Sequence, residues 1–182
     1  MAKLAFRPYG YVVHHALQAE QFAPELHGHS QKPEIGADAI VMQYLSPPTP
    51  DKSGWVTLYD LTISHYQMVF EKRVEIHGRL RKIVSILKSL DLVHGDFRPN
   101  NLMIKVVAGG NAFVEPITVN AIDMEWAGKV GEAYYPGDRN GAVGYPGHAG
   151  GCIGADDDAC MVQSWWDKIN SFLFSVAHST IT

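Results

Sequence analysis

Acidic and amide side chains stand beside apolar runs at two places in this chain of 182 residues. In the first segment, Asp96 is followed five positions later by Asn101, which opens the run 102–104. In the second segment, Asp123 directly follows the apolar pair 121–122. Carboxylate and amide oxygens are the ligands that Mg²⁺ prefers, and a positioned carboxylate can accept a proton during catalysis. An Asp followed by an Asn at this distance is common by itself, so the chemistry depends on what surrounds the two segments.

Together, residues 92–104 and 119–128 resemble the catalytic loop and the metal-binding motif of the protein-kinase-like superfamily. The form His-Gly-Asp at 94–96, with Asp-Met-Glu at 123–125 in place of Asp-Phe-Gly, is more similar to aminoglycoside phosphotransferases and fungal kinase-like proteins than to ordinary Ser/Thr kinases. The resemblance implies an ATP- and Mg²⁺-dependent phosphotransferase that transfers the γ-phosphate of ATP to a hydroxyl acceptor.

The resemblance also implies a role for each polar residue. Asp123 and Asn101 match the metal ligands, because phosphoryl transfer needs hard oxygen ligands beside the nucleotide. Asp96 matches the catalytic carboxylate that accepts the proton of the attacking hydroxyl, and Arg98 matches a basic catalytic group near the transferred phosphate. His94 would hold the backbone of the loop rather than transfer protons.

Hydrophobic periodicity predicts the elements that must position these residues. The expected helices cover residues 9–22, 62–73 and 76–90, and a last helix begins at the acidic triplet 156–158. The expected strands cover residues 39–45, 102–107 and 117–122, the last two forming a hairpin. Nine glycines and two prolines between residues 127 and 154 argue against regular structure in that segment.

The segments before the catalytic loop resemble the nucleotide-binding parts of the family. The strand over 39–45 is similar to the strand and hinge between the two lobes, where backbone groups of Gln43 and Leu45 would meet the adenine edge. Lys3 lies just upstream of the first helix and resembles the strand lysine that contacts phosphate. The resemblance therefore implies cofactor-binding roles for Lys3, Gln43 and Leu45.

The remaining elements follow the order of a kinase-like chain. The helix over 9–22 takes the place of helix αC, and Asp158 resembles the buried Asp that anchors the catalytic loop. The expected fold is a single α+β, protein-kinase-like domain over residues 1–182. Residues 1–45 would form a reduced N-lobe with the hinge strand, and residues 46–182 a mostly helical C-lobe.

Three features depart from the family pattern. No glycine-rich strand-turn-strand precedes the first helix, and residues 11–15 offer no glutamate to pair with Lys3, since Glu20 lies late in the helix. The arginine before the catalytic Asp of regulated kinases is Gly95 here, so we do not expect regulation by phosphorylation of the activation loop. The alternatives to an active enzyme are a catalytically weak or inactive pseudokinase-like binding or scaffold protein, and a kinase gene fragment.

Other polar groups have simpler interpretations. His14 and His15 are adjacent and would point to different faces of a helix, while His27 and His29 could share one face of a strand but lack a third ligand nearby. Solvated histidines are therefore favoured over a metal site. Glu125 is either a metal-site carboxylate beside Asp123 or a polar residue at the end of a strand. Cys160 has no adjacent base or cation in the sequence and is expected to be a buried, unreactive thiol.

The charge balance narrows the expected partners. The chain has 15 Lys and Arg against 19 Asp and Glu, a net charge of −4, whereas a nucleic-acid binder normally shows a basic surplus. No stretch approaches the roughly 18 consecutive apolar residues of a membrane span, and no secretory leader is evident, so we expect no membrane partner and an intracellular, cytoplasmic location. The expected partners are a nucleotide and a hydroxyl acceptor, either a protein or a small molecule. The segment 129–155, which would recognise the acceptor, has no readable motif.

Overall fold

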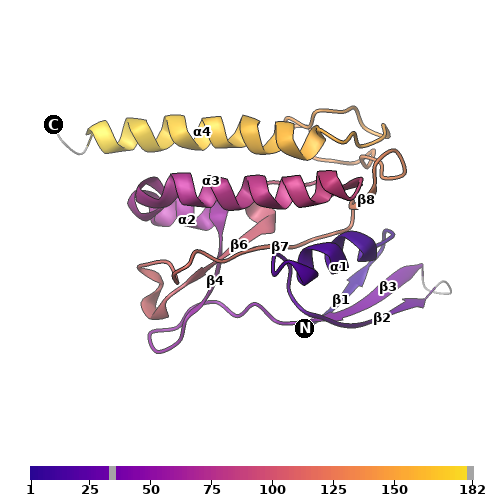
Figure 1. Cartoon of the computed structure of the whole chain (residues 1–182), viewed down its shortest axis with the longest axis horizontal. Helices are drawn as coiled ribbons and strands as arrows, with labels where there is room; N and C mark the ends of the chain where they lie inside the picture. Colours follow the sequence, from indigo (N-terminus) through magenta and orange to yellow (C-terminus); the bar gives the residue numbers. More distant parts are fainter. Residues whose placement is uncertain (33–35, 180–182) are drawn as a thin grey trace.

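The computed structural model describes residues 1–32 and 36–179, with side chains described for residues 1–30 and 36–172. The α-helices of this part are α1 (Tyr11–Ala19), α2 (Leu58–Ser64), α3 (Tyr66–Ser89) and α4 (Asp157–Ser179). The strands are β1 (Ala2–Ala5), β2 (Leu26–Lys32), β3 (Ala37–Met42), β4 (Gly54–Thr57), β5 (Leu92–Val93), β6 (Leu102–Val106), β7 (Val119–Ala121) and β8 (Gly128–Lys129). Helices α3 and α4 lie side by side along the long axis, with the small sheets beneath them (Figure 1).

The N-terminal residues form an antiparallel sheet in the order β1-β3-β2, and α1 lies over it (Figure 1). In the register of this sheet, Lys3 and His29 both pair with Ile40 of the central strand. Ile40 is fully buried, whereas Val41 points to the solvent, as the alternation of a half-buried strand requires. The strand that we expected over 39–45 is therefore β3, which begins earlier, at Ala37, and ends at Met42.

His14 on α1 is buried, so the expectation of a solvated histidine is wrong at this position. Its Nδ1 lies 2.7 Å from the Tyr9 hydroxyl and its Nε2 lies 2.7 Å from the Pro24 carbonyl oxygen. Burial lowers the pKa of the imidazole, and the carbonyl partly opposes this effect. His14 is thus a neutral core residue whose hydrogen bonds connect α1 to the segments before and after it.

Helix was predicted over 62–73 and is found there, but its bounds are wrong, because the chain breaks at His65 into two helices. The His65 backbone has φ −137° and ψ 43°, outside the helical region, and it separates α2 from α3. Helix α2 starts earlier than expected because the Thr57 side chain caps it, accepting a hydrogen bond from the Asp60 amide at 3.0 Å. Helix α3 starts earlier because its buried stripe already includes Val69.

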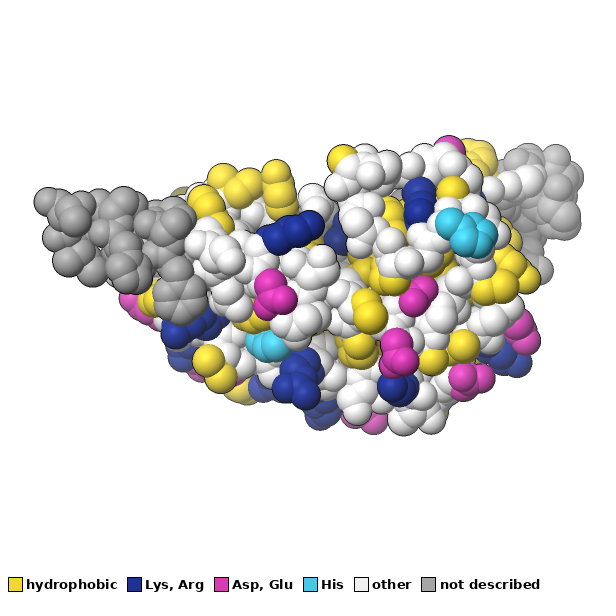
Figure 2. All heavy atoms as spheres, turned by 90° about the horizontal axis from the view of Figure 1, so that it is seen from above, with side chains coloured by type: hydrophobic (Ala, Val, Ile, Leu, Met, Phe, Trp, Pro, Cys, Tyr) yellow, Lys and Arg dark blue, Asp and Glu magenta, His cyan; other side chains and the backbone are white. Residues whose placement is uncertain are grey.

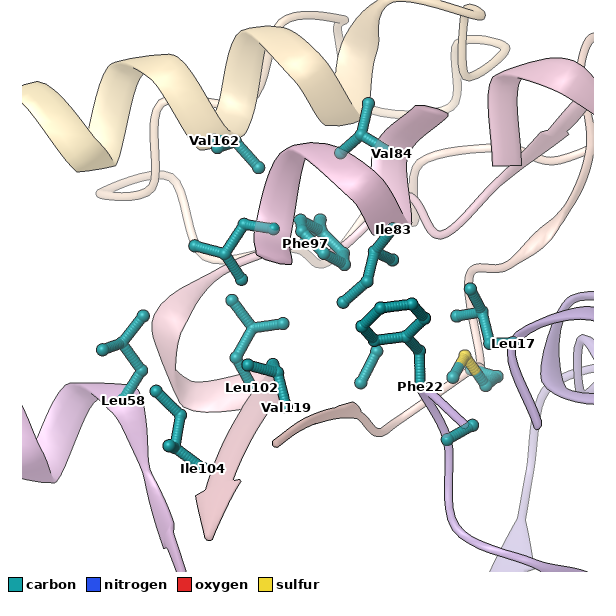
Figure 3. Close-up of a cluster of buried hydrophobic side chains, with 14 of the residues drawn as sticks. Leu17, Phe22, Leu58, Ile83, Val84, Phe97, Leu102, Ile104, Val119 and Val162 are labelled. Atoms are coloured by element: carbon teal, nitrogen blue, oxygen red, sulfur yellow. The ribbon is translucent and has the colours of Figure 1, made fainter. Parts of the chain in front are cut away.

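The predicted hairpin is confirmed, with β6 and β7 paired so that Leu102 faces Ala121 and Ile104 faces Val119. Strand β4 adds to the other edge of β6, with Val56 opposite Ile104. This sheet packs under α2 and α3, and its inward residues enter the main core. Figure 3 shows side chains from α1, α2, α3, β6, β7 and α4 converging around Phe22 and Phe97.

The segment 127–154 contains more order than its composition predicted. Strand β8 pairs with β5, and an isolated bridge joins Tyr134 to Cys152. A second apolar cluster packs this segment against β5, and its buried members are Val93, Ala133, Tyr135 and Ile153. Tertiary contacts of a few aromatic and aliphatic side chains therefore order a chain whose glycines disfavour local structure.

Helix α4 begins at the predicted acidic triplet and buries one stripe, which includes Met161, Val162 and Trp166. Cys160 lies outside this stripe and is exposed, so the expectation of a buried thiol is wrong. Successive helical residues are about 100° apart, and Cys160 therefore projects to the side of the stripe that begins at Met161.

Charged side chains of both signs are interspersed on the face that Figure 2 presents, with hydrophobic patches between them. Within the ranges described above, no helix combines the length and the apolar character that a membrane crossing would require.

The α3 stripe generates a stability prediction. We expect Leu80→Ala, at a fully buried position, to lower the free energy of unfolding by about 3 kcal/mol, because the substitution leaves a cavity in the main core. Leu90→Ala makes the same chemical change at the exposed end of this helix and should cost no more than about 0.5 kcal/mol. Urea unfolding followed by circular dichroism measures both, and equal losses would contradict the assigned core.

Candidate functional site

The loop after β5 is held by a carboxylate from α4. Asp158 is buried and accepts hydrogen bonds from the backbone amides of His94 at 2.6 Å and Gly95 at 2.9 Å. Burial raises the pKa of Asp158, while the nearby His94 and the two amide donors act in the opposite direction. The loop backbone therefore depends on a residue that lies more than 60 positions away in the sequence.

Gly95 fits this loop for steric reasons. Its φ of +78° lies in the left-handed region, and a Cβ there would come within 2.5 Å of the Ile153 side chain and 3.0 Å of the Trp126 carbonyl oxygen. A larger residue would have to displace both neighbours, and its backbone would also be strained. The glycine in His-Gly-Asp thus permits close packing between the loop and the segment after β8.

His94 connects the loop to the strand that precedes Asp123. Its Nδ1 accepts a hydrogen bond from the Asp96 amide at 3.3 Å, and its Nε2 lies 3.0 Å from the Ile122 carbonyl oxygen. These two contacts require a ring with its proton on Nε2, which donates to that carbonyl. The imidazole is fully buried and joins two backbone segments, a structural position of the kind the family resemblance implied.

The Asp96 side chain is 5% exposed, and its two carboxylate oxygens have different neighbours. Oδ2 accepts a hydrogen bond at 2.8 Å from the amide nitrogen of Asn101, which also donates to the Asp96 carbonyl oxygen at 2.9 Å. Oδ1 accepts a hydrogen bond from the Tyr145 hydroxyl at 2.9 Å and lies 3.1 Å from Arg98 Nε. The Arg98 Nε–H is not aligned for a hydrogen bond, so its contact with Asp96 is an ion pair. Because the Asn101 nitrogen is used here, its amide oxygen is the atom left to act as a ligand.

Asp123 and Glu125 share one cation. Lys3 Nζ lies 2.5 Å from Asp123 Oδ1 and 2.6 Å from Glu125 Oε1. Half-burial lowers the pKa of Lys3, but its hydrogen bonds and charge interactions with both carboxylates outweigh burial and raise it. Asp123 adopts a left-handed φ of 67°, a strained conformation that a non-glycine residue adopts at a cost on the order of 1 kcal/mol. Strain of this kind is found where a side chain must be aimed for a function.

A cleft of about 360 Å³ lies between the N-terminal sheet and the hairpin. It is lined by Lys3, Gln43, Leu45, Asn101 and Asp123. All three residues with predicted cofactor-binding roles and both predicted metal ligands therefore border one cavity. The two predicted catalytic residues, Asp96 and Arg98, do not line it, but Asp96 is bonded to the Asn101 side chain that does.

Backbone hydrogen bonding limits which main-chain groups of the segment after β3 are available to a ligand. The Gln43 amide already donates to the Glu25 carbonyl oxygen at 2.7 Å, which continues the sheet beyond β3. The Gln43 carbonyl is therefore its available backbone group, because the N–H is committed.

Two participants in this site were not assigned from the sequence. Tyr145 comes from the glycine-rich segment without a readable motif, and no spacing signal could have placed its hydroxyl on Asp96. Glu125 was considered only as a metal-site carboxylate or a strand-end residue, and its contact with Lys3 depends on the position of β1. Trp165 also supports the loop, because its Nε1–H donates to the Phe97 carbonyl oxygen at 2.9 Å.

A scan against protein-family models and a search of curated proteins found no match for this sequence. Comparison with solved structures shows that the chain has a kinase-like fold. One similar structure is that of PK-1, the kinase of Cydia pomonella granulovirus, with a TM-score of 0.57 and 16% sequence identity. The match covers 92% of this chain and 58% of the viral one, so the chain spans a little over half the length of that kinase.

The anchoring carboxylate generates a second prediction. We expect Asp158→Asn to destabilise the protein by about 2 kcal/mol, because the amide group would present a donor to one of the two backbone N–H groups that the carboxylate now accepts. Urea unfolding measures the loss, and hydrogen exchange should quicken at the His94 and Gly95 amides. Asp156→Asn is the matched control, since Asp156 forms only an exposed ion pair with Lys88 and its loss should leave the unfolding midpoint unchanged. Unchanged exchange in the Asp158 variant would contradict the anchoring role.

Proposed function

We propose that this protein is an ATP- and Mg²⁺-dependent phosphotransferase that moves the γ-phosphate of ATP to a hydroxyl acceptor. The observation that carries the proposal is the single cleft bordered by Lys3, the segment 43–45, Asn101 and Asp123. A lysine, a segment with free main-chain groups and two hard oxygen ligands around one cavity are what a nucleotide with its metal requires. The kinase-like fold supports the same activity.

In this proposal, residues 1–45 form a reduced N-lobe with the hinge, and residues 46–182 form the C-lobe; residues 33–35 and 180–182 lie outside the described residues. The adenine edge lies against the hinge, where the Gln43 carbonyl accepts a hydrogen bond from the exocyclic amine and the Leu45 N–H donates to a ring nitrogen.

The donor set suits Mg²⁺, because the Asn101 amide oxygen and the Asp123 carboxylate are hard oxygen ligands that leave room for phosphate oxygens. Glu125 offers a further carboxylate beside Asp123. The metal would neutralise the charge that develops on the phosphates during transfer. Lys3 balances the charge of the two carboxylates, and its flexible ammonium would be the group that contacts the phosphates.

Asp96 accepts the proton of the acceptor hydroxyl through Oδ1, because Oδ2 is held by Asn101. This bond fixes the orientation of the carboxylate relative to the metal ligand. Arg98, paired with the same Oδ1, supplies positive charge beside the point of transfer. The loop anchor at Asp158 keeps these groups in place while substrates exchange.

A second candidate function is a nucleotide-binding protein without transferase activity. Two contacts favour it. Lys3 pairs with Asp123 and Glu125 and not with a glutamate of α1. The Tyr145 hydroxyl is hydrogen-bonded to the Asp96 carboxylate, where an acceptor hydroxyl would have to bind. Within residues 1–32 and 36–42, no glycine-rich turn covers the phosphate end of the cleft. The two candidates agree on nucleotide binding and differ on the role of Asp96.

Nucleotide binding is tested by thermal unfolding. We expect ATP with Mg²⁺ to stabilise the protein by about 2.7 kcal/mol at a hundredfold excess over its dissociation constant, because the ligand binds only the folded state. Asp123→Ala should remove the part of this stabilisation that depends on Mg²⁺, whereas Asp51→Ala, in an exposed turn, should retain it. If saturating ATP and Mg²⁺ leave the melting temperature unchanged, neither candidate function holds for this chain.

The role of Asp96 separates the two candidates. We expect Asp96→Asn to lower phosphate transfer at least about a hundredfold, the usual contribution of a general base, while ATP with Mg²⁺ still raises the melting temperature. Release of labelled phosphate or transfer to added hydroxyl compounds measures the rate, with Asp51→Asn as the control. Equal rates for the parent and the Asp96 variant would rule out the assigned proton acceptor.

A further inference from the structure

The Tyr145 hydroxyl stands where a phosphate acceptor would stand. It donates a hydrogen bond at 2.9 Å to Oδ1 of Asp96, the carboxylate oxygen that Asn101 does not hold. In hydroxyl phosphorylation, the acceptor must give its proton to such a carboxylate during transfer. The contact thus reproduces, within one chain, the arrangement of a base and its substrate hydroxyl.

Packing holds the Tyr145 ring in this position. Its centroid lies 5.3 Å from that of Trp126 and 5.6 Å from that of Tyr135, both in the smaller apolar cluster. A Cβ on Gly147 would come within 2.6 Å of the Tyr135 ring, so the chain beside Tyr145 passes close to this cluster. Packing against these aromatic rings therefore holds the phenol hydroxyl at Asp96.

Two guanidinium groups flank the phenol. Arg98 lies on the same Asp96 oxygen, and Arg139 stacks 5.0 Å from the Tyr145 ring centroid. The Arg139 Nη1 is buried and has no hydrogen-bond partner among the described residues, so it has a donor available for an added anion. Arginine is well suited to hold a phosphate because its planar donors match the phosphate oxygens.

The protonation state of the phenol agrees with this position. Burial raises the pKa of Tyr145 well above its ordinary value, and the negative charge and hydrogen bond of Asp96 raise it further. The hydroxyl is consequently neutral at physiological pH. A neutral phenol needs a base to take its proton as the new bond forms, and Asp96 is in contact with it.

We propose that Tyr145 is a modification site of this protein, phosphorylated within the same molecule by the catalytic centre it touches. Tyr145 Oη forms a bond to the γ-phosphorus of ATP, the bond from that phosphorus to the β–γ bridging oxygen breaks, and ADP leaves. The proton of Oη passes to Asp96 and then to solvent. The product is a phosphotyrosine dianion, which Asp96 repels and which Arg98 and Arg139 can bind.

This inference rests on the proposed phosphotransferase function and goes beyond it, because it identifies a particular acceptor. It also revises the expectation, drawn from Gly95, that this chain lacks an arginine able to bind a phosphate on this segment. The arginine missing before Asp96 is replaced in space by Arg98 and Arg139, which the chain brings to the same tyrosine.

The experiment incubates the purified full chain with labelled ATP and Mg²⁺ and maps the label by mass spectrometry. Trypsin releases residues 140–168, in which Tyr145 is the single tyrosine. We expect the label on this residue, with a first-order rate constant that stays unchanged when the protein is diluted. Tyr145→Phe and Asp96→Asn should each abolish it, whereas Tyr134→Phe, an exposed tyrosine of the same segment, should leave it unchanged.

Other outcomes overturn the inference in distinguishable ways. A rate constant that falls on dilution would show transfer between molecules and exclude the intramolecular step. ATP binding together with transfer to water or to added hydroxyl compounds, but with no label on Tyr145, would reject the modification site and leave the phosphotransferase function intact. No nucleotide binding in the thermal assay would reject both.

Discussion

The two backbone hydrogen bonds that Asp158 accepts are the interaction on which the site depends. They tie the loop at His94 and Gly95 to the start of α4, and α4 is in turn packed along α3. The His94 side chain in turn hydrogen-bonds to the Ile122 carbonyl oxygen, next to Asp123, and so connects the loop to the end of β7. A buried carboxylate with two amide donors is stable because its desolvation is offset by charge-assisted hydrogen bonds. The loop and the strand end thus share one anchor.

Electrostatic balance is the second requirement of the cleft. Two carboxylates from one strand end lie within a few ångströms of each other, and their repulsion is relieved by the ammonium of Lys3. In this chain, Lys3 of β1 pairs with Asp123 and Glu125, which follow β7, and not with a glutamate of α1. Lys3 therefore supplies the positive charge that compensates this acidic pair. This explains how a small sheet with few cations can border an acidic site.

The glycine-rich segment 127–154 contributes through its aromatic residues. Its backbone has little intrinsic preference for one conformation, yet Tyr135 and Tyr145 pack with Trp126 and fix its path. As a result, the Tyr145 hydroxyl is hydrogen-bonded to Asp96, and the Arg139 guanidinium lies over the rings of Tyr135 and Tyr145. A long connection in a compact domain thus becomes part of the site through side-chain packing.

The helices, the hairpin and the polar segments could be predicted from the sequence because each is a local pattern. Periodicity identified α3, α4 and the β6–β7 pair, and the spacing from Asp96 to Asn101 directed attention to the loop. Periodicity failed at His65, where an earlier helix cap and a backbone break outweighed a continuous pattern. Periodicity also did not predict the burial of His14, because its hydrogen-bond partners, Tyr9 and Pro24, lie in the segments on either side of α1.

By itself, the sequence determined which residue types could bind a metal or accept a proton, and the order of the elements that carry them. Only the tertiary structure decided their partners: Lys3 with Asp123, 120 positions apart, and Tyr145 with Asp96, 49 positions apart. Such pairs depend on the packing of whole elements against a shared core, which sets distances that no local spacing encodes.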